Sequence, residues 1–326
     1  MKCKNCGKNH DLTICFVYHS PEAKALLDAN RRFIEEMDPA MNIQWLIADN
    51  TPEGRKATQH RQEGSVIIVP GAEMPMDKPA YARRSYHHAR GLNKLLPYIQ
   101  TRYALVLDID FFILPREGIT ASIEHMCRNN LAFFGAPYHP KHYRKVRYFP
   151  CQHCLFVDTD KIALDTLDFD PQVPEIRSKP ALKSRIARKI KKQIIGPRYR
   201  VGQTFDTGYP IYQRYYRDSH YKWDYVNPVW DARPSFFEHF LPERLSFYPK
   251  RKTYVYPLSF ATLGYPGDDS LNGEAYVWNG LPFGYHVRDS THKMLRNFDA
   301  KMKTINSFLQ KFIKNPVLLT ASQIKE

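Results

Sequence analysis

No apolar run in this 326-residue chain approaches the roughly 20 residues that a membrane-spanning helix needs, so we expect no transmembrane segment. The first residues, Met1–Cys6, also lack the apolar stretch of a secretory signal peptide. Internal repeats and low-complexity tracts are absent as well, which excludes repeat architectures. These absences predict a soluble, cytoplasmic protein whose six cysteines are reduced or bound to metal.

Acidic residues are fewer than basic ones: 33 Asp and Glu face 48 Lys and Arg, which leaves a net charge of +15. This balance favours acidic partners such as nucleotide diphosphates, anionic lipid surfaces or nucleic acid, without choosing among them. The length and the hydrophobic content of 43% allow one large α/β domain or two smaller ones.

Apolar, strand-like segments alternate with helical segments through the first half of the chain. Helices are expected at residues 21–37 after an N-cap at Ser20, at 79–96 after a cap at Asp77, and at 119–129. Strands are expected at Leu12–Tyr18, Ile43–Ala48, Ser65–Val69, Tyr103–Asp110 and Leu131–Ala136. This alternation predicts an α/β protein with a doubly wound, mostly parallel sheet.

The second half is less regular. A short strand is expected at Leu155–Val157, and helices are expected at residues 181–195, 204–217 and 292–313. Short strands and loops should fill the aromatic-rich stretch 218–284, and the last helix should pack back on the domain.

Two carboxylates end the most apolar predicted strand. Asp108 and Asp110 are two residues apart, and alternate side chains of a strand point the same way. They can therefore converge on one hard cation, which prefers oxygen ligands. A divalent ion at the carboxyl end of a strand in an open α/β sheet is suited to clamp a diphosphate. A solvated turn, in which Asp is common, is the alternative.

The segments Ser85–Asn93 and Thr101–Asp110 resemble the family 2-like glycosyltransferases with the GT-A fold. In those enzymes a second strand ends in an acid, and a long helix precedes a strand that ends in Asp-x-Asp. The resemblance covers residues 12–160 and continues more loosely through 204–214 and 284–290. Where many members have Ala-Arg-Asn-x-Gly, this chain has Ala89-Arg90-Gly91-Leu92-Asn93, although Arg90 is retained.

On the donor side, the resemblance implies a role for four residues outside the acidic pair. Tyr18 and His19 would edge the nucleotide base and ribose, Asp49 would bond the base, and Arg90 would lie near the diphosphate. The alternatives are ordinary core or cap residues for Tyr18 and His19, and a turn at Asp49.

For the acidic pair, the resemblance implies that Asp110 ligates Mn²⁺ or Mg²⁺ and that Asp108 lies near the ribose or the metal. GT-A enzymes often return a histidine from the C-terminal part to the metal. His286 holds that position, with His292 as the rival, and Arg288 would then reach the diphosphate. A neutral imidazole is a reasonable third ligand. A strand residue on a polar face is the alternative for His286.

An inverting glycosyl transfer needs a base that takes the proton of the acceptor hydroxyl, and a carboxylate suits this task. Relatives place an acid at the start of a helix after the acceptor-binding strand, and Asp206 matches that place. A helix cap is the alternative, and Glu238, Asp268 and Asp269 are the reserve candidates.

Two Cys-x2-Cys pairs, Cys3 with Cys6 and Cys151 with Cys154, form a candidate structural Zn²⁺ site. Reduced thiols, with Cys154 in the core, are the alternative. The basic segment Lys183–Lys192 is either a solvated helix, a peripheral contact with an anionic membrane, or a contact with nucleic-acid phosphates.

The sequence therefore predicts a metal-dependent glycosyltransferase that moves a hexosyl or pentosyl group from a nucleotide-diphosphate sugar to an acceptor hydroxyl, with inversion. A glycan or lipid-linked saccharide is the expected acceptor. The alternatives are a modified base in nucleic acid, or a non-catalytic nucleic-acid-binding protein on a degenerate scaffold. The expected divisions are an N-terminal Cys segment (1–11), a nucleotide-sugar half (12–160), an irregular acceptor half (161–290) and a C-terminal helix and tail (291–326).

Overall fold

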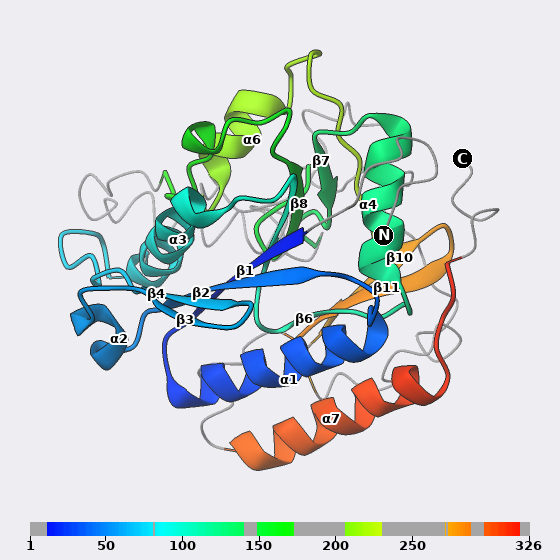
Figure 1. The fold of residues 1–326 in the computed structure, drawn as a ribbon, viewed down its shortest axis with the longest axis horizontal. Helices are drawn as coiled ribbons and strands as arrows, with labels where there is room; N and C mark the ends of the chain where they lie inside the picture. The colour runs from blue at the N-terminus through cyan, green and yellow to red at the C-terminus, as the bar shows by residue number, and fades with distance from the viewer. Residues whose placement is uncertain are drawn as a thin grey trace, which may run out of the picture.

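Figure 1 shows the computed structural model, which describes residues 12–80, 82–139, 149–172, 206–229, 271, 273–287 and 297–319. Several predicted features lie outside these residues: Cys3, Cys6, the basic segment Lys183–Lys192, Glu238, Asp268, Asp269, Arg288 and His292.

Within the described residues, the larger sheet has seven strands in the order β3-β4-β2-β1-β5-β8-β7. Strands β4, β2, β1 and β5 are parallel, whereas β3 and β8 run antiparallel to their neighbours. The bounds are β1 Leu12–Tyr18, β2 Ile43–Asp49, β3 Arg61–Glu63, β4 Val66–Pro70, β5 Tyr103–Leu107, β7 Phe133–Gly135 and β8 Cys154–Asp158. The predicted α/β class with a doubly wound, mostly parallel sheet is confirmed.

Helices cover both faces of this sheet because its central strands are apolar on both sides. In β1, Leu12, Ile14 and Phe16 join one hydrophobic core, and Cys15 and Val17 join the other, as the period of two requires. Helices α1 (Pro21–Met37), α4 (Gly118–Asn129) and α7 (Phe298–Lys314) contribute to the first core. Helices α3 (Arg83–Leu95) and α6 (Tyr209–Tyr215) contribute to the second.

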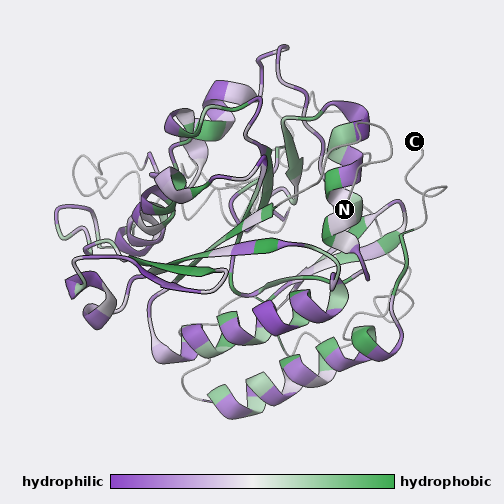
Figure 2. Cartoon of the chain, in the orientation of Figure 1, coloured by the Kyte–Doolittle hydropathy of each residue, from purple (hydrophilic) through white to green (hydrophobic). Residues whose placement is uncertain are grey.

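The layering is visible in Figure 1, where α1 and α7 lie side by side along one face of the sheet and α3 lies on the other. Figure 2 shows largely hydrophobic central strands and helices on which hydrophilic and hydrophobic residues alternate. Each fully buried side chain, such as Leu26 or Phe33 of α1, stabilises this packing by about 1.5–3 kcal/mol.

The two predicted helix caps have different outcomes. Ser20 caps α1 as predicted, because its hydroxyl accepts a hydrogen bond from the amide of Ala23 at 3.2 Å. The predicted cap at Asp77 is wrong, because α3 begins only at Arg83 and has no side-chain cap. The Arg83 guanidinium donates to the carbonyls of Met76 and Lys78, which holds the preceding segment in a turn. The short helix α2 (Pro52–Lys56) was not predicted.

A second, antiparallel sheet has the order β6-β11-β10-β9 among the described residues. Its strands are β6 Phe111–Ile113, β9 Asn227–Pro228, β10 Glu274–Trp278 and β11 Leu281–His286. Asn279 and Gly280, with φ angles of 49° and 79°, form the tight turn between β10 and β11. Strand β6 pairs with β11 across more than 160 residues of sequence, so this sheet joins the predicted nucleotide and acceptor halves. The divisions at residues 160 and 290 stay predictions.

Among the helices that the structure describes, none has the length and apolar character that crossing a bilayer would require.

Candidate active site

The acidic pair lies in a turn rather than in a strand. Strand β5 ends at Leu107, and Asp108-Ile109-Asp110 leads from the larger sheet into β6 of the smaller one. The turn is fixed by the bond from the Asp108 amide to the His153 carbonyl (3.1 Å) and by the bond from the Val287 amide to the Asp110 carbonyl (2.9 Å). The prediction of a continuous strand through Asp110 is therefore wrong, yet the two carboxylates still point to one place.

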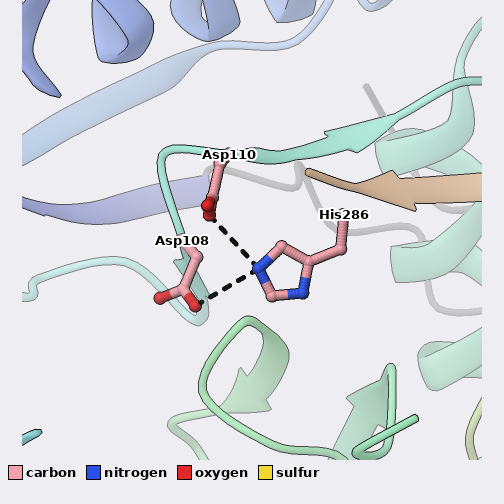
Figure 3. Close-up of side chains that lie close together, drawn as sticks. All are labelled: Asp108, Asp110 and His286. Atoms are coloured by element: carbon pink, nitrogen blue, oxygen red, sulfur yellow. Dashed lines mark hydrogen bonds and ion pairs between the residues drawn. The ribbon is translucent and has the colours of Figure 1, made fainter. Parts of the chain in front are cut away.

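Asp108, Asp110 and His286 converge at this turn (Figure 3). Nε2 of His286 is 3.2 Å from Oδ1 of Asp110 and 3.8 Å from Oδ2 of Asp108. One ligand atom from each of the three residues lies within 4.8 Å of the others. His286 is buried and the two carboxylates are only slightly exposed, so few waters can screen them.

These residues fit a divalent cation. Two carboxylates crowded around one imidazole nitrogen repel each other, and a cation at their common focus would remove that repulsion. Carboxylates suit Mg²⁺, Ca²⁺ and Mn²⁺, whereas imidazole suits the first-row transition metals. The mixed set of two carboxylates and one imidazole therefore fits a divalent ion such as Mn²⁺.

His88 of α3 reaches the same place and was missed by the sequence analysis. Its Nε2 lies 3.2 Å from Oδ1 of Asp108, at an angle too poor for a hydrogen bond. Burial lowers the pKa of His88, but contact with Asp108 and the charges of Asp110 and Asp206 outweigh burial and raise the pKa above its usual value.

Asp206 is buried and precedes α6. Its Oδ1 accepts a hydrogen bond from the amide of Thr207 at 2.9 Å, whereas the N-cap of α6 is Gly208, without a side-chain cap. The alternative of an ordinary helix cap is therefore not what the structure shows. The hydroxyl of the next residue, Thr207, donates to the Ser85 carbonyl at 3.3 Å, which places Asp206 beside α3, the helix that carries His88.

The predicted donor-side residues lie at the carboxyl edge of the larger sheet. Tyr18 ends β1 and is paired in register with Asp49 at the end of β2. Burial and a hydrogen bond to Asp49 raise the pKa of Tyr18. Asp49 also accepts hydrogen bonds from the amide and the hydroxyl of Thr51, at 3.0 and 2.6 Å. The roles predicted for Tyr18 and Asp49 toward a nucleotide stay predictions.

His19 follows Tyr18 and is exposed, and Arg90 is half-buried on α3. Burial and the neighbouring Asp168 raise the pKa of Asp170, and the charge of Arg90 opposes this rise, so Arg90 acts on that acidic loop. The roles predicted for His19 and Arg90 also stay predictions.

The departure at Gly91 has a steric reason. A Cβ at Gly91 would lie 2.8 Å from Cγ1 of Val17 and 3.0 Å from Nδ2 of Asn50, because α3 packs closely on β1 at this point. Asn50 also donates to the His87 carbonyl and accepts from the amide of Ala72, both at 2.8 Å. This buried amide fixes the turn of α3 that carries His88.

Cys151 and Cys154 are both buried near the acidic turn. Sγ of Cys151 lies 2.8 Å from Nδ1 of His153, and burial raises the pKa of the Cys154 thiol, which disfavours the thiolate that zinc requires. Because Cys3 and Cys6 lie outside the described residues, the predicted zinc site stays a prediction.

Glu274 was also missed. It lies behind His286, with Oε2 3.4 Å from Nδ1 of the ring, and its side chain is fully buried. The signal for this contact was the Asn279-Gly280 dipeptide between two alternating segments, which is typical of a hairpin. A two-residue turn there places Glu274 opposite His286.

No family model matches this chain, and no curated protein matches it. Similar solved structures are glycosyltransferases. The mannosyltransferase PcManGT from Pyrobaculum calidifontis, in complex with GDP-Man and Mn²⁺, has 11% identity and a TM-score of 0.35, over 51% of this chain and 49% of its own length. The chain therefore spans about half of that protein.

The galactosyltransferase LgtC, in complex with donor and acceptor sugar analogues, has 15% identity and a TM-score of 0.38, over 76% of this chain and 84% of its own. A glycosyltransferase involved in glycosylation of the major capsid of PBCV-1 has 14% identity and a TM-score of 0.31, over 66% and 81%. Such low scores do not define a function, which rests on the site itself. Family 2 in particular is not among these findings.

Proposed function

We propose that this protein is a metal-dependent glycosyltransferase that moves a hexosyl or pentosyl group from a nucleotide-diphosphate sugar to an acceptor hydroxyl. The observation that carries the proposal is the convergence of Asp108, Asp110 and His286 from two sheets. The position of these residues also supports the proposal. After β1 the chain adds β2 and β4 on one side of the larger sheet, and β5 then pairs with the other side of β1, so the strand order reverses between β1 and β5. In open α/β sheets, ligands bind at the carboxyl ends of strands where the strand order reverses in this way.

The three side chains would hold Mn²⁺ or Mg²⁺, with Asp110 and His286 as the closest pair of donors. A bound divalent ion at this position supplies electrostatic stabilisation of a departing nucleotide diphosphate. Tyr18, His19 and Asp49 would bind the base and ribose at the ends of β1 and β2, and Arg90 with the outlying Arg288 would bind the diphosphate.

Asp206 is the proposed general base for an inverting transfer. The acceptor oxygen attacks the anomeric carbon, the bond from that carbon to the diphosphate oxygen breaks, and the hydroxyl proton passes to the Asp206 carboxylate. Its burial, and the hydrogen bond from the adjacent Thr207 hydroxyl to the Ser85 carbonyl of α3, support this role. Asp206→Asn should lower kcat by about 100-fold or more, with little change in donor binding.

The acceptor proposed is a glycan or a lipid-linked saccharide, and the proposed location is the cytoplasm. The basic segments that suggested nucleic acid or a membrane surface lie outside the described residues, and no observation of the structure favours either partner.

The proposal is tested with the full chain and a panel of nucleotide sugars in the presence of Mn²⁺. We expect donor hydrolysis that depends on the metal, and thermal stabilisation by one nucleotide diphosphate together with Mn²⁺. Asp110→Asn should abolish this turnover while the protein stays folded. The matched control is Asp28→Asn, which removes a carboxylate from the surface of α1 and should leave turnover unchanged. Wild-type rates in Asp110→Asn would contradict the proposal, as would steeply salt-dependent nucleic-acid binding with no nucleotide-sugar effect.

A further inference from the structure

Glu274 is a carboxylate with no access to water. Its side chain is 0% exposed, and the residue lies at the start of β10. Burying a carboxylate costs several kcal/mol unless other groups compensate, so Glu274 needs neighbouring groups that donate a hydrogen bond to it or carry positive charge. The Tyr276 hydroxyl donates a hydrogen bond to Oε2 at 3.3 Å, and Nδ1 of His286 lies 3.4 Å from the same oxygen, within ion-pair distance but outside hydrogen-bond geometry.

The hairpin dictates this contact. Glu274 and His286 are directly opposed residues of β10 and β11, and side chains at opposed positions lie on the same face of a sheet. Tyr276, two residues on, shares that face and lies opposite Gly284. The missing side chain at Gly284 leaves room for the ring of Phe111, which packs 5.6 Å from the His286 ring and 5.5 Å from the Tyr276 ring, centroid to centroid.

The two nitrogens of the His286 ring face different groups. Nε2 faces Asp108 and Asp110, whereas Nδ1 faces Glu274. Glu274 is therefore on the far side of the ring from the candidate cation position and cannot be a ligand of the same ion. In metal sites, the nitrogen of a histidine that does not bind the metal usually donates to a carboxylate or carbonyl, which fixes the tautomer and the ring plane.

We infer that Glu274 is a positioning residue that holds the Nδ1 proton of His286 and thereby aims the Nε2 lone pair at the cation between Asp108 and Asp110. This inference rests on the metal-dependent function proposed above. Glu274 acts only through His286, and its negative charge also makes the imidazole a stronger donor to the cation. The His286 ring packs 4.9 Å from His153 as well, so it has little freedom to turn when Glu274 is in place.

The test measures binding of Mn²⁺ alone to the full chain by electron paramagnetic resonance, with no donor present. Glu274→Leu removes the acceptor, and Glu274→Gln keeps an oxygen but removes the charge. We expect affinity to fall by about 10- to 100-fold in Glu274→Leu and by less in Glu274→Gln. The matched control is Glu35→Leu, the same substitution at an exposed glutamate of α1 that pairs with Arg31; its affinity should stay near that of the wild type.

A second readout separates positioning from a structural role. Glu274→Leu takes the carboxylate away from the Tyr276 hydroxyl and from Nδ1 of His286, and removing one partner of a buried pair is destabilising, so thermal stability is measured beside Mn²⁺ affinity and affinities are compared only among variants that are folded at the assay temperature. With Co²⁺ in place of Mn²⁺, the exchangeable Nδ1 proton of the ligating histidine should give a strongly shifted proton NMR signal in the wild type. That signal should persist in Glu35→Leu and be lost to solvent exchange in Glu274→Leu.

Equal Mn²⁺ affinity in folded wild type and Glu274→Leu would overturn the role of Glu274 and leave the metal-dependent function standing. Failure of the wild type itself to bind Mn²⁺ would overturn both.

Discussion

The two sheets of this protein are built in opposite ways. The larger sheet takes its parallel strands from one continuous stretch, residues 12–107, with a helix packed between successive strands. The smaller sheet pairs β6 with β11, more than 160 residues later in the chain, beside the hairpin of β10 and β11, and its strands are antiparallel. The first supplies the frame, and Asp108 directly follows the end of its strand β5. The second supplies His286 and Glu274, and Asp110 lies in the turn that joins the two.

This difference bears on which changes should reach the candidate ligands. Large, fully buried side chains lie on both sheets, such as Tyr276 and Phe283 on the smaller sheet and Phe16 and Phe156 on the larger sheet. The candidate ligands lie at its margin, where the smaller sheet begins. A change in the frame should therefore act on folding first, and a change in the smaller sheet should act on cation binding first.

The largest effect is expected from Phe156→Ala in β8. Phe156 is fully buried and packs against Phe134, so its truncation should destabilise the protein by about 3–5 kcal/mol. Urea denaturation measures the loss, and Mn²⁺ affinity of the protein that remains folded should be unchanged. A loss of less than about 1 kcal/mol in the free energy of unfolding would contradict the expectation that a change in the larger sheet acts first on folding.

The next effect concerns Asp38, which links the end of α1 to the start of α4. Its carboxylate accepts hydrogen bonds from the amides of Ile119 (3.2 Å) and Thr120 (3.1 Å), yet burial dominates and raises the pKa of Asp38 to about 6. The folded protein thus binds more protons than the unfolded chain between about pH 4 and 6. Its stability should fall as pH rises through that window, by at most about 3 kcal/mol from this residue.

Asp38→Asn isolates this contribution. The stability of the variant relative to the wild type should rise between pH 4 and 6, as measured by denaturant unfolding at several pH values. A flat or reversed difference would mean that the amides at the start of α4 stabilise the charged form more than burial opposes it.

A smaller loss of stability, with a larger effect on the site, is expected from Gly284→Ala. The new Cβ would lie 2.6 Å from Cζ of Phe111, whose ring would have to move away from His286. Such overpacking should lower the free energy of unfolding by about 1–3 kcal/mol and also displace the imidazole. The loss in the free energy of Mn²⁺ binding should therefore be larger than the loss in the free energy of unfolding. Gly280→Ala is a poor control because of its positive φ, whereas Ala275→Gly removes a methyl group from the same sheet without crowding Phe111. Unchanged Mn²⁺ binding in Gly284→Ala would contradict the expectation that a change in the smaller sheet acts first on cation binding.

The smallest effect is expected for the ion pair of Lys24 and Asp28, 2.7 Å apart on the exposed side of α1. Lys24→Gln should change stability by less than about 0.5 kcal/mol and leave Mn²⁺ binding unaltered. A measured effect above 1 kcal/mol would mean that α1 stabilises the sheet through its surface charges as well as its apolar side.

The same contrast decides what could be predicted from the sequence. Strand β1, helix α1 with its Ser20 cap and strand β5 were predicted because their signals are local: apolar runs, a capping serine and a proline at the first turn. The acidic pair was predicted for the same reason, although the strand before it ends sooner. The start of α3 was wrong because the Arg83 side chain holds the preceding turn through contacts that no local pattern reveals.

His88 and Glu274 could not be predicted in this way. Their roles depend on contacts across the fold, from α3 to the acidic turn and from β10 to β11. His286 was predicted only because a resemblance supplied its place in the chain order. The hairpin signal at Asn279-Gly280 would have paired Glu274 with His286, but it would not have placed either beside Asp110.

Asn30 of α1 has a consequence for when the site arises. Its fully buried amide donates to the carbonyls of Ile109 and Phe111, one on each side of Asp110, at 3.1 and 2.9 Å. The backbone on both sides of Asp110 is thus held in place by helix α1. We expect that a refolding chain acquires affinity for a cation only after α1 has packed against this turn. The time at which cation binding appears during refolding would then report when α1 docks.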